Sequence, residues 1–186
     1  MTLLRLLCLS ASLTWIACGQ DVLTKSEWKT FESVKYRYRV RYPASWYLFT
    51  TPLAPKLDSL DILNFPPEEA ARGVILKESG ANITVGPAPP QIKTIDQWVQ
   101  DDSKVITIIG QREVKELPRK PTGCLELHEV VAKQEMGPEM FFVYTGYYCR
   151  TSRGLFRILL VNRAEDPNQE NLREIARKIA LSLQSW

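Results

Sequence analysis

The sequence predicts an α+β domain in which a twisted antiparallel sheet is covered by helices. Two observations lead to this fold class. Short β-rich runs follow one another closely enough to pair as hairpins, and only two segments, one short and one long, space their apolar residues as helices do. The chain has 186 residues, of which 45% are hydrophobic and 24% charged, a composition ordinary for a globular domain with a substantial core.

The clearest strand pattern is the run YRYRVRY at residues 36–42. Apolar and aromatic side chains alternate with arginines there, which is the period of a strand with one buried face. Pro43 ends the run. Four basic residues spaced two apart are expected to share the opposite, exposed face of this strand: Lys35, Arg37, Arg39 and Arg41.

Further strands and a short helix are predicted in the middle of the chain. Residues 52–69 contain several prolines and are expected to form a loop, whereas residues 74–77 and 82–85 have the composition of two hairpin strands. Thr94 is an expected N-cap, because Gln97 follows it at the spacing of a capping box. The short helix should therefore begin directly after Thr94.

The C-terminal half predicts a three-stranded meander followed by a long helix. The strands are expected at residues 123–133, 140–150 and 155–163. Asp166-Pro167 then begins a helix with proline at its first position. An apolar stripe at helical spacing would pack that helix on the sheet, and it consists of Leu172, Ile175, Ala176, Ile179, Ala180 and Leu183.

The N-terminal residues predict export. Residues 1–17 form a signal peptide with one basic residue and an apolar core that is too short to span a bilayer. Ile16-Ala17-Cys18 resembles a bacterial lipobox, which predicts cleavage before Cys18 and lipidation of that cysteine. An ordinary cut at Ala17-x-Gly19 is the alternative, and Cys18 would then be incidental. Residues 18–30 are expected to form a tether and residues 31–186 a single domain.

Two other cysteines, Cys124 and Cys149, are predicted to form a disulfide. A hairpin with a four-residue loop at residues 135–138 would place them directly opposite each other, at a Cα separation that a disulfide accepts. An oxidising envelope would allow the bond to form. A redox-active pair is the alternative, but the chain has no C-x-x-C motif.

Catalytic and metal-binding motifs are absent from the sequence. His128 is the only histidine, so a Ser-His-Asp or Cys-His site would have to use it, and no G-x-S-x-G motif accompanies it. No phosphate-binding glycine loop or metal-ligand spacing occurs, and neither a cofactor nor a metal site is predicted. Without residues 1–17 the net charge is only +2, which argues against a nucleic-acid partner.

From about residue 31 to residue 183 the chain resembles the PsbP-like domains, named after the oxygen-evolving-enhancer protein of photosystem II. The carriers of this resemblance are the segment YRVRYPASW at residues 38–46, the short helix at 94–99, and the meander followed by a helix ending in IALSL at 179–183. The resemblance implies a central antiparallel sheet between helical layers, an α/β/α sandwich. It also implies a non-enzymatic role in docking on, or assembling, larger complexes.

These observations predict a non-catalytic binding or accessory module of the bacterial cell envelope. The protein would be membrane-anchored and face the periplasm, or be secreted if Cys18 is not lipidated, and its partner would be an envelope protein or complex. The basic stripe could be its binding surface, or a solvated face paired with nearby glutamates. The alternatives are an envelope carrier or sensor of a small ligand and, least favoured, a hydrolase that uses His128.

Overall fold

The computed structural model describes residues 27–50, 59–70, 80–115, 117 and 123–186. Its strands form two antiparallel sheets. The larger sheet has the order β3 (Tyr47–Thr50), β4 (Leu60–Leu63), β5 (Ala81–Pro87), β9 (Leu155–Arg163), β8 (Met140–Arg150), β7 (Glu126–Gly137) and β6 (Thr107–Glu113). The smaller sheet has the order β1 (Trp28–Ser33), β2 (Tyr38–Pro43) and β10 (Gln184–Ser185).

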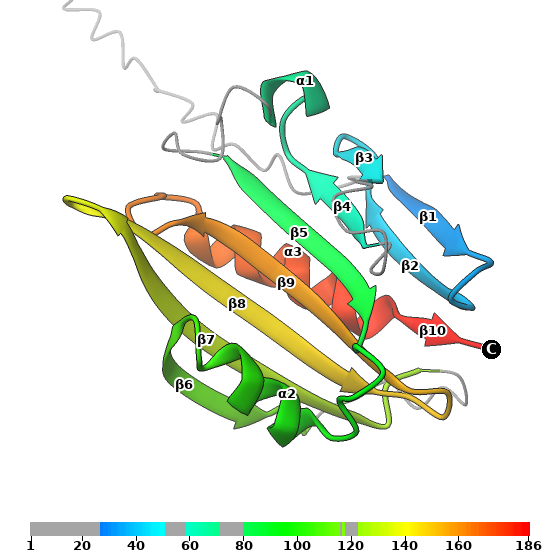
Figure 1. Cartoon of the computed structure of the whole chain (residues 1–186). Helices are drawn as coiled ribbons and strands as arrows, with labels where there is room; N and C mark the ends of the chain where they lie inside the picture. Colours follow the sequence, from blue (N-terminus) through cyan, green and yellow to red (C-terminus); the bar gives the residue numbers. More distant parts are fainter. Residues whose placement is uncertain (1–26, 51–58, 71–79, 116, 118–122) are drawn as a thin grey trace, which may run out of the picture.

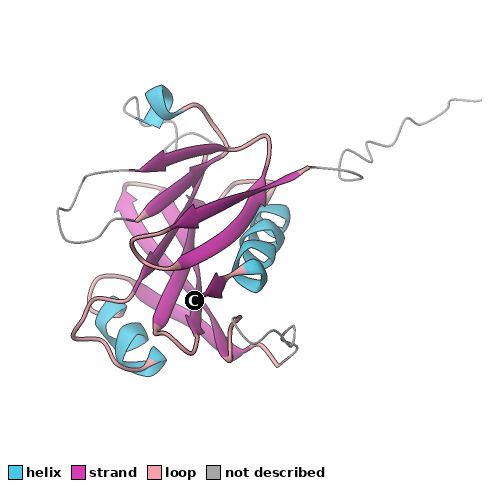
Figure 2. Ribbon diagram, turned by 90° about the vertical axis from the view of Figure 1, so that its right-hand side faces the viewer, coloured by secondary structure: helices cyan, strands magenta, loops and turns pink. Residues whose placement is uncertain are grey.

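Three helices accompany these sheets in the described part of the chain: α1 (Pro67–Ala70), α2 (Ile95–Asp102) and α3 (Gln169–Ser182). The long helix α3 contacts β8 and β9 of the large sheet and also β2, whereas α2 contacts β8. Figures 1 and 2 show that α2 and α3 lie on opposite faces of the large sheet. The predicted α+β class, with an antiparallel sheet between helices, is confirmed.

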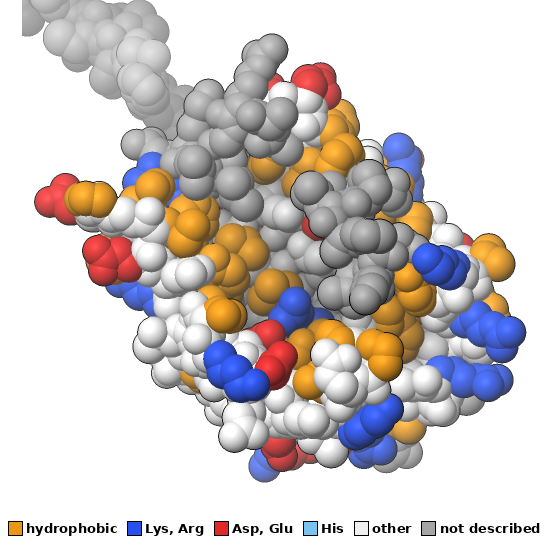
Figure 3. Space-filling view, in the orientation of Figure 1, with side chains coloured by type: hydrophobic (Ala, Val, Ile, Leu, Met, Phe, Trp, Pro, Cys, Tyr) orange, Lys and Arg blue, Asp and Glu red, His pale blue; other side chains and the backbone are white. Residues whose placement is uncertain are grey.

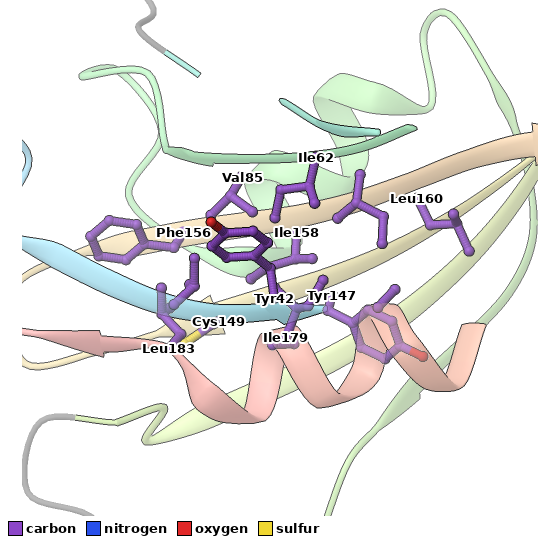
Figure 4. Packing of buried hydrophobic residues seen from close by; sticks show 14 of the residues in the cluster. Tyr42, Ile62, Val85, Tyr147, Cys149, Phe156, Ile158, Leu160, Ile179 and Leu183 are labelled. Atoms are coloured by element: carbon purple, nitrogen blue, oxygen red, sulfur yellow. The ribbon is translucent and has the colours of Figure 1, made fainter. Parts of the chain in front are cut away.

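The main core lies between the large sheet and α3, with the small sheet closing it on the side of β2. Tyr42 of β2, Ile62 of β4, Tyr147 of β8, Ile158 of β9 and Ile179 of α3 meet there (Figure 4). All five side chains are buried. The stripe predicted for α3 provides its share of this core, since every member except Ile175 is fully buried.

A smaller core fills the space under α2 on the opposite face. Trp98 stacks edge-on against Tyr148 of β8, with ring centroids 5.5 Å apart. The predicted cap of this helix is present, because the Thr94 side chain accepts a hydrogen bond from the backbone N–H of Gln97. In return, the Gln97 side chain accepts one from the N–H of Lys93, one residue before the position of the standard capping box.

The predicted register of the β7–β8 hairpin is wrong. Cys149 lies opposite Leu127 rather than Cys124, and His128 lies opposite Tyr148. The reason is the turn: Gly137 already pairs with Met140, and Glu139 adopts a left-handed backbone with φ of 61°, so the connection is tighter than a four-residue loop. The observed pairing differs from the predicted one by an odd number of residues. Side chains that were predicted to share a face of the hairpin therefore lie on opposite faces.

Several predicted boundaries also shift. β1 begins at Trp28, so the last three residues of the expected tether belong to the fold. The expected loop at residues 52–69 contains β4 and most of α1. The long helix begins at Gln169, because Asp166 accepts a hydrogen bond from the N–H of Asn168 and closes a turn there first. The expected strand at residues 74–77 lies outside the described residues.

Candidate functional site

A basic cleft lies where the small sheet meets the end of α3. It is open to solvent and has a volume of about 480 Å³. Its walls come from β1, β2, β10 and the last turns of α3. The residues that line this basic cleft are Trp28, Thr30, Arg39, Val40, Arg41, Lys178, Leu181, Ser182 and Gln184.

The alternation of β2 explains how two arginines reach the cleft. Tyr38, Val40 and Tyr42 point into the main core and are buried, so Arg39 and Arg41 between them point outward. Trp28 and Thr30 of β1 lie in register with Pro43 and Arg41 of β2 and share this outward face. A strand pattern of period two therefore builds one wall of the cleft.

The other wall is held by hydrogen bonds between β2 and the end of the chain. The backbone N–H of Arg41 donates to the Ser182 hydroxyl at 2.8 Å, and Arg39 Nε donates to the Gln184 side-chain oxygen at 2.8 Å. β10 also pairs with β2 through Gln184 and Ser185. These contacts fix the end of α3, and with it Lys178 and Leu181, against the small sheet.

Among the described residues that line the cleft, none is acidic. Arg39, Arg41 and Lys178 are exposed. Two described acids lie near them: Glu32 is opposite Arg39 on β1, and a Glu174 carboxylate oxygen lies 3.8 Å from Lys178 Nζ. An exposed pair at that distance contributes little binding energy, so the cleft presents a net positive charge to solvent.

The structure brings together only half of the predicted basic stripe. Arg39 and Arg41 lie on β2 as expected, but Lys35 and Arg37 lie in the turn that precedes it. Arg37 has a left-handed backbone, with φ of 52°, and its carbonyl accepts a hydrogen bond from the N–H of Trp186. The strand begins two residues later than predicted because this turn reverses the chain from β1. Lys178 replaces them as the third cation of the cleft, and only the tertiary fold places it there.

Sequence reasoning missed a buried charge centre around Glu129 on β7. This side chain is only 2% exposed and accepts hydrogen bonds from Arg112 of β6, Arg173 of α3 and the Tyr147 hydroxyl of β8. Burial raises the pKa of the Glu129 carboxyl, but the hydrogen bonds from Arg173, Arg112 and Tyr147 outweigh that effect and lower the pKa to about 2. We call these four residues the Glu129 centre.

The Glu129 centre joins three neighbouring strands of the large sheet, β6, β7 and β8, to the helix α3. Burial and the neighbouring carboxylate raise the pKa of the Tyr147 hydroxyl, which therefore remains a donor. Arg173 donates to the carboxylate at 2.7 Å and thereby ties α3 to β7. With an ionised acid, two permanent cations and no described nucleophile among its members, this centre is suited to structure rather than to proton transfer.

A second hollow, of about 220 Å³, lies on the α2 face. Its charges are paired: Arg157 donates to Asp102 at 2.5 Å and lies over the Trp98 ring, 5.1 Å from the ring centroid. The Tyr148 hydroxyl donates to the same Asp102 carboxylate. Figure 3 shows charged side chains beside apolar area in this part of the molecule. The hollow offers a ligand fewer uncommitted charges than the basic cleft does.

His128 lies at the surface of β7 and not in either hollow. Its Nε2 lies 3.1 Å from a Glu126 carboxylate oxygen, and its Nδ1 lies 3.3 Å from the Gln111 amide nitrogen. Neither neighbour is the serine or cysteine that a Ser-His-Asp or Cys-His site requires. The contacts that the structure gives to His128 therefore do not assemble the hydrolase site, the least favoured prediction from the sequence.

The predicted disulfide is present despite the altered register. Cys124 and Cys149 are bonded, with Cα atoms 5.5 Å apart. Cys124 comes before Glu126, the first residue of β7 that pairs with β8, so the pairing of the two strands does not fix its position. Cys149 is fully buried in the main core, a place that suits a structural bond. Cys18, the predicted lipidation site, lies outside the described residues.

Among the residues with described positions, no cluster of three or more histidine, cysteine or acidic side chains could hold a metal ion. None of the helices described is long and apolar enough to cross a membrane.

Comparisons with known proteins give structural similarities only. No family model and no curated protein sequence matches the chain. The chain is similar to cyanobacterial PsbP (CyanoP) from Synechocystis sp. PCC 6803, at TM-score 0.48 and 12% identity, over 91% of this chain and 98% of that one. A solved PsbP structure is thus among those similar to this chain, in line with the resemblance stated from the sequence.

Two further solved structures are similar at the same 12% identity. One is a protein from Bacteroides thetaiotaomicron, at TM-score 0.46; the matched region covers 85% of this chain and 48% of that one. The other is LpqN, a protein involved in cell envelope biogenesis of Mycobacterium tuberculosis, at TM-score 0.30 over 86% of this chain and 84% of that one. We transfer no site residue from any of the three.

Proposed function

We propose that this protein is an exported, lipid-anchored, non-catalytic binding module of the bacterial cell envelope. In this proposal the basic cleft is its binding site, and the domain serves as an accessory to an envelope protein or complex. Lipidation of Cys18 holds it at the membrane, with the domain facing the periplasm. The function needs no cofactor.

The observation that carries the proposal is the charge of the basic cleft. Three cations, Arg39, Arg41 and Lys178, converge on one open hollow, and the described part of its lining contains no acid. Surface charges that serve only solubility are usually interspersed with charges of opposite sign, whereas convergent charges of one sign attract a complementary partner. The charged groups elsewhere, in the Glu129 centre and at Asp102–Arg157, are already paired within the fold.

The packing of the main core favours a surface-binding module over a carrier that holds its ligand between sheet and helix. Tyr147, Ile158, Leu160 and Ile179 fill that space and are each at most 1% exposed (Figure 4). A carrier would need a cavity between the sheet and the helix, whereas these side chains pack on one another there. We therefore place binding at the surface.

The anchor is tested by the intact mass of the protein extracted from bacterial membranes. We expect a chain that begins at Cys18 and carries the added mass of its acyl groups. A Cys18→Ser variant should lose that mass and the membrane fraction of mature protein. An unmodified N-terminus at or beyond Gly19 would contradict the anchor.

The binding role is tested by crosslinking in native membranes, with a tag after Trp186 and identification by mass spectrometry. We expect repeated recovery of one envelope complex by the native protein, and its loss when Arg39, Arg41 and Lys178 are changed together to glutamine. A matched control removes the same charge from Lys93, Lys104 and Arg153, which are exposed and lie outside the cleft. Equal recovery by all three proteins would contradict a role for the cleft.

A further inference from the structure

We propose that the basic cleft binds the phosphate headgroups of anionic phospholipids, so that β1, β2 and the end of α3 lie against the membrane surface. This inference rests on the proposed function, because it names a ligand for the same cleft and assumes the lipid anchor at Cys18. Three features of the cleft support it: its charge, its apolar part, and its position next to the start of the fold.

The charges in the cleft suit a phosphodiester. Arginine presents parallel N–H donors that match phosphate oxygens, and lysine adds a compact charge. The nearby C-terminus of α3 carries a partial negative charge of only about half a unit, so it cannot neutralise three full positive charges. Arg39 donates one N–H to Gln184, and no described residue accepts from its other guanidinium donors, which could bind a phosphate oxygen. The cleft therefore keeps an excess of cationic donors.

The apolar part of the cleft suits the membrane interface. Trp28 and Leu181 line it and are only half-buried, although both pack against the edge of the main core. Tryptophan favours the headgroup level of bilayers, where its ring meets acyl chains and its N–H meets polar groups. A phosphate site next to a tryptophan and a leucine matches the layering of a phospholipid headgroup above its glycerol and acyl chains.

The chain itself brings the cleft to the membrane. Trp28, which lines the cleft, is also the first residue of β1, and it lies ten positions after Cys18. Even a fully extended segment of that length spans only about 35 Å. In the anchored protein the cleft is thus confined near the bilayer, which raises the effective concentration of headgroups around it. Figure 3 shows Lys and Arg side chains gathered at the edge of the molecule formed by β1 and β2.

A second basic hollow, lined by Arg112, Lys115 and Arg177, fits a headgroup less well. Glu113 is among its lining residues, and Arg112 already donates to the buried Glu129. Glu174 lies 3.8 Å from Arg177 and equally 3.8 Å from Lys178, so it does not distinguish the two hollows. The difference is that Arg112 of the second hollow is committed to Glu129 and that the described lining includes Glu113 and no aromatic residue.

The experiment uses the chain from Gly19 to Trp186, which keeps every described residue and lacks the anchor. Its partitioning is measured on vesicles of phosphatidylethanolamine with 25% phosphatidylglycerol and on vesicles of neutral phosphatidylcholine, at about 0.1 M salt. The same three chains are compared: native, the triple glutamine variant of the cleft (Arg39, Arg41 and Lys178), and the control triple variant (Lys93, Lys104 and Arg153). Circular dichroism verifies that each is folded.

We expect the native chain to prefer the anionic vesicles and to lose that preference as salt rises. Each cation near a charged surface contributes roughly a fivefold effect, so the cleft variant should bind roughly 100-fold more weakly. The control variant should change by less than about fivefold. Equal losses in the cleft and control variants would overturn the proposal, since net charge alone would then explain the binding.

Because this experiment omits the anchor, its outcome is independent of lipidation. No preference of the native chain for anionic vesicles would overturn the lipid proposal and leave the binding module intact. Recovery of an acidic protein partner that depends on the same three cations would also overturn it, and would at the same time support the proposed function. Failure of both experiments would remove the cleft as a binding site.

Discussion

The Glu129 centre and the basic cleft lie on either side of α3 and use arginine in opposite ways. In the centre, Arg112 and Arg173 converge on one carboxylate that is 2% exposed. In the cleft, Arg39 and Arg41 converge with Lys178 on an open hollow that no described acid lines. The first arrangement satisfies its charges inside the fold, and the second directs them outward.

This difference separates stability from binding. A buried carboxylate that loses its cations or its charge destabilises the fold, because the remaining groups are desolvated without compensation. Exposed cations contribute little to stability even where an exposed acid lies nearby, as Glu174 does beside Lys178. Grouping three of them in one hollow slightly opposes folding by mutual repulsion. The fold tolerates such a group most readily where an external anion compensates it.

The largest expected effect comes from removing the buried carboxylate. Glu129→Ala should lower the free energy of unfolding by about 3 kcal/mol, because Arg112, Arg173 and Tyr147 lose a shared acceptor and a cavity remains. Urea denaturation followed by circular dichroism measures this loss. Binding through the cleft should be unchanged wherever the variant remains folded.

Glu170→Ala is the matched control for that prediction. Its carboxylate also pairs with Arg173, at 3.6 Å, but the side chain is 90% exposed. Its loss should change the stability by less than about 0.5 kcal/mol. Equal losses in the two variants would contradict a special role for the buried pair.

The pH dependence of stability sharpens the same point. The Glu129 pKa is about 2 in the fold against an ordinary value of 4.5, so the unfolded chain binds this proton more readily. The contribution of the ionised Glu129 carboxylate to the free energy of unfolding is therefore complete above pH 4.5, and it declines as the pH falls from 4.5 towards 2. The pKa of Glu126 is also lowered, chiefly by a hydrogen bond from Arg150, and acts in the same direction.

Urea titrations of the native chain and of Glu129→Gln across this pH range separate the two carboxyls. The variant should start less stable at pH 6 and lose less stability on acidification, since only Glu126 and the ordinary acids remain to titrate. Parallel curves for the two proteins would show that Glu129 has an ordinary pKa in the fold.

The disulfide is expected to have the next largest effect. It closes a loop of residues 124–149, and the chain-entropy model gives about 3.5 kcal/mol for a loop of that length. The paired β7 and β8 strands already restrict this loop, so the Cys124→Ser/Cys149→Ser variant should lose about 2 kcal/mol. A peptide map without reduction should show the 124–149 crosslink, and its absence from exported protein would contradict the bond.

Local patterns predicted the elements of this fold well. The alternation at residues 38–42, the cap at Thr94 and the stripe of α3 each correspond to what the structure contains. These signals depend only on neighbouring residues, because a strand or helix must hide one face from water. The outward placement of Arg39 and Arg41 follows from the same alternation.

Contacts between distant segments could not be predicted in this way. The β7–β8 register depends on the turn at Gly137–Met140, where the left-handed backbone of Glu139 shortens the connection. Glutamate rarely adopts a left-handed backbone, so its presence does not predict this turn. The Glu129 centre collects residues from β6, β7, β8 and α3, and a lone glutamate in a strand has no local sign of burial. Lys178 was missed as a cleft residue for the same reason.

The smallest effect on stability is expected in the cleft, and it completes the comparison. Changing Arg39, Arg41 and Lys178 together to glutamine should leave the free energy of unfolding within about 1 kcal/mol of the native value, because their described side-chain partners, Gln184 and the exposed Glu174, are not buried carboxylates. A slight gain would follow if their mutual repulsion opposes folding. The same variant should lose binding, which Glu129→Ala retains, so the two regions would separate in both measurements. A loss of several kcal/mol in the cleft variant would instead show that these cations hold the fold, and the contrast between the regions would disappear.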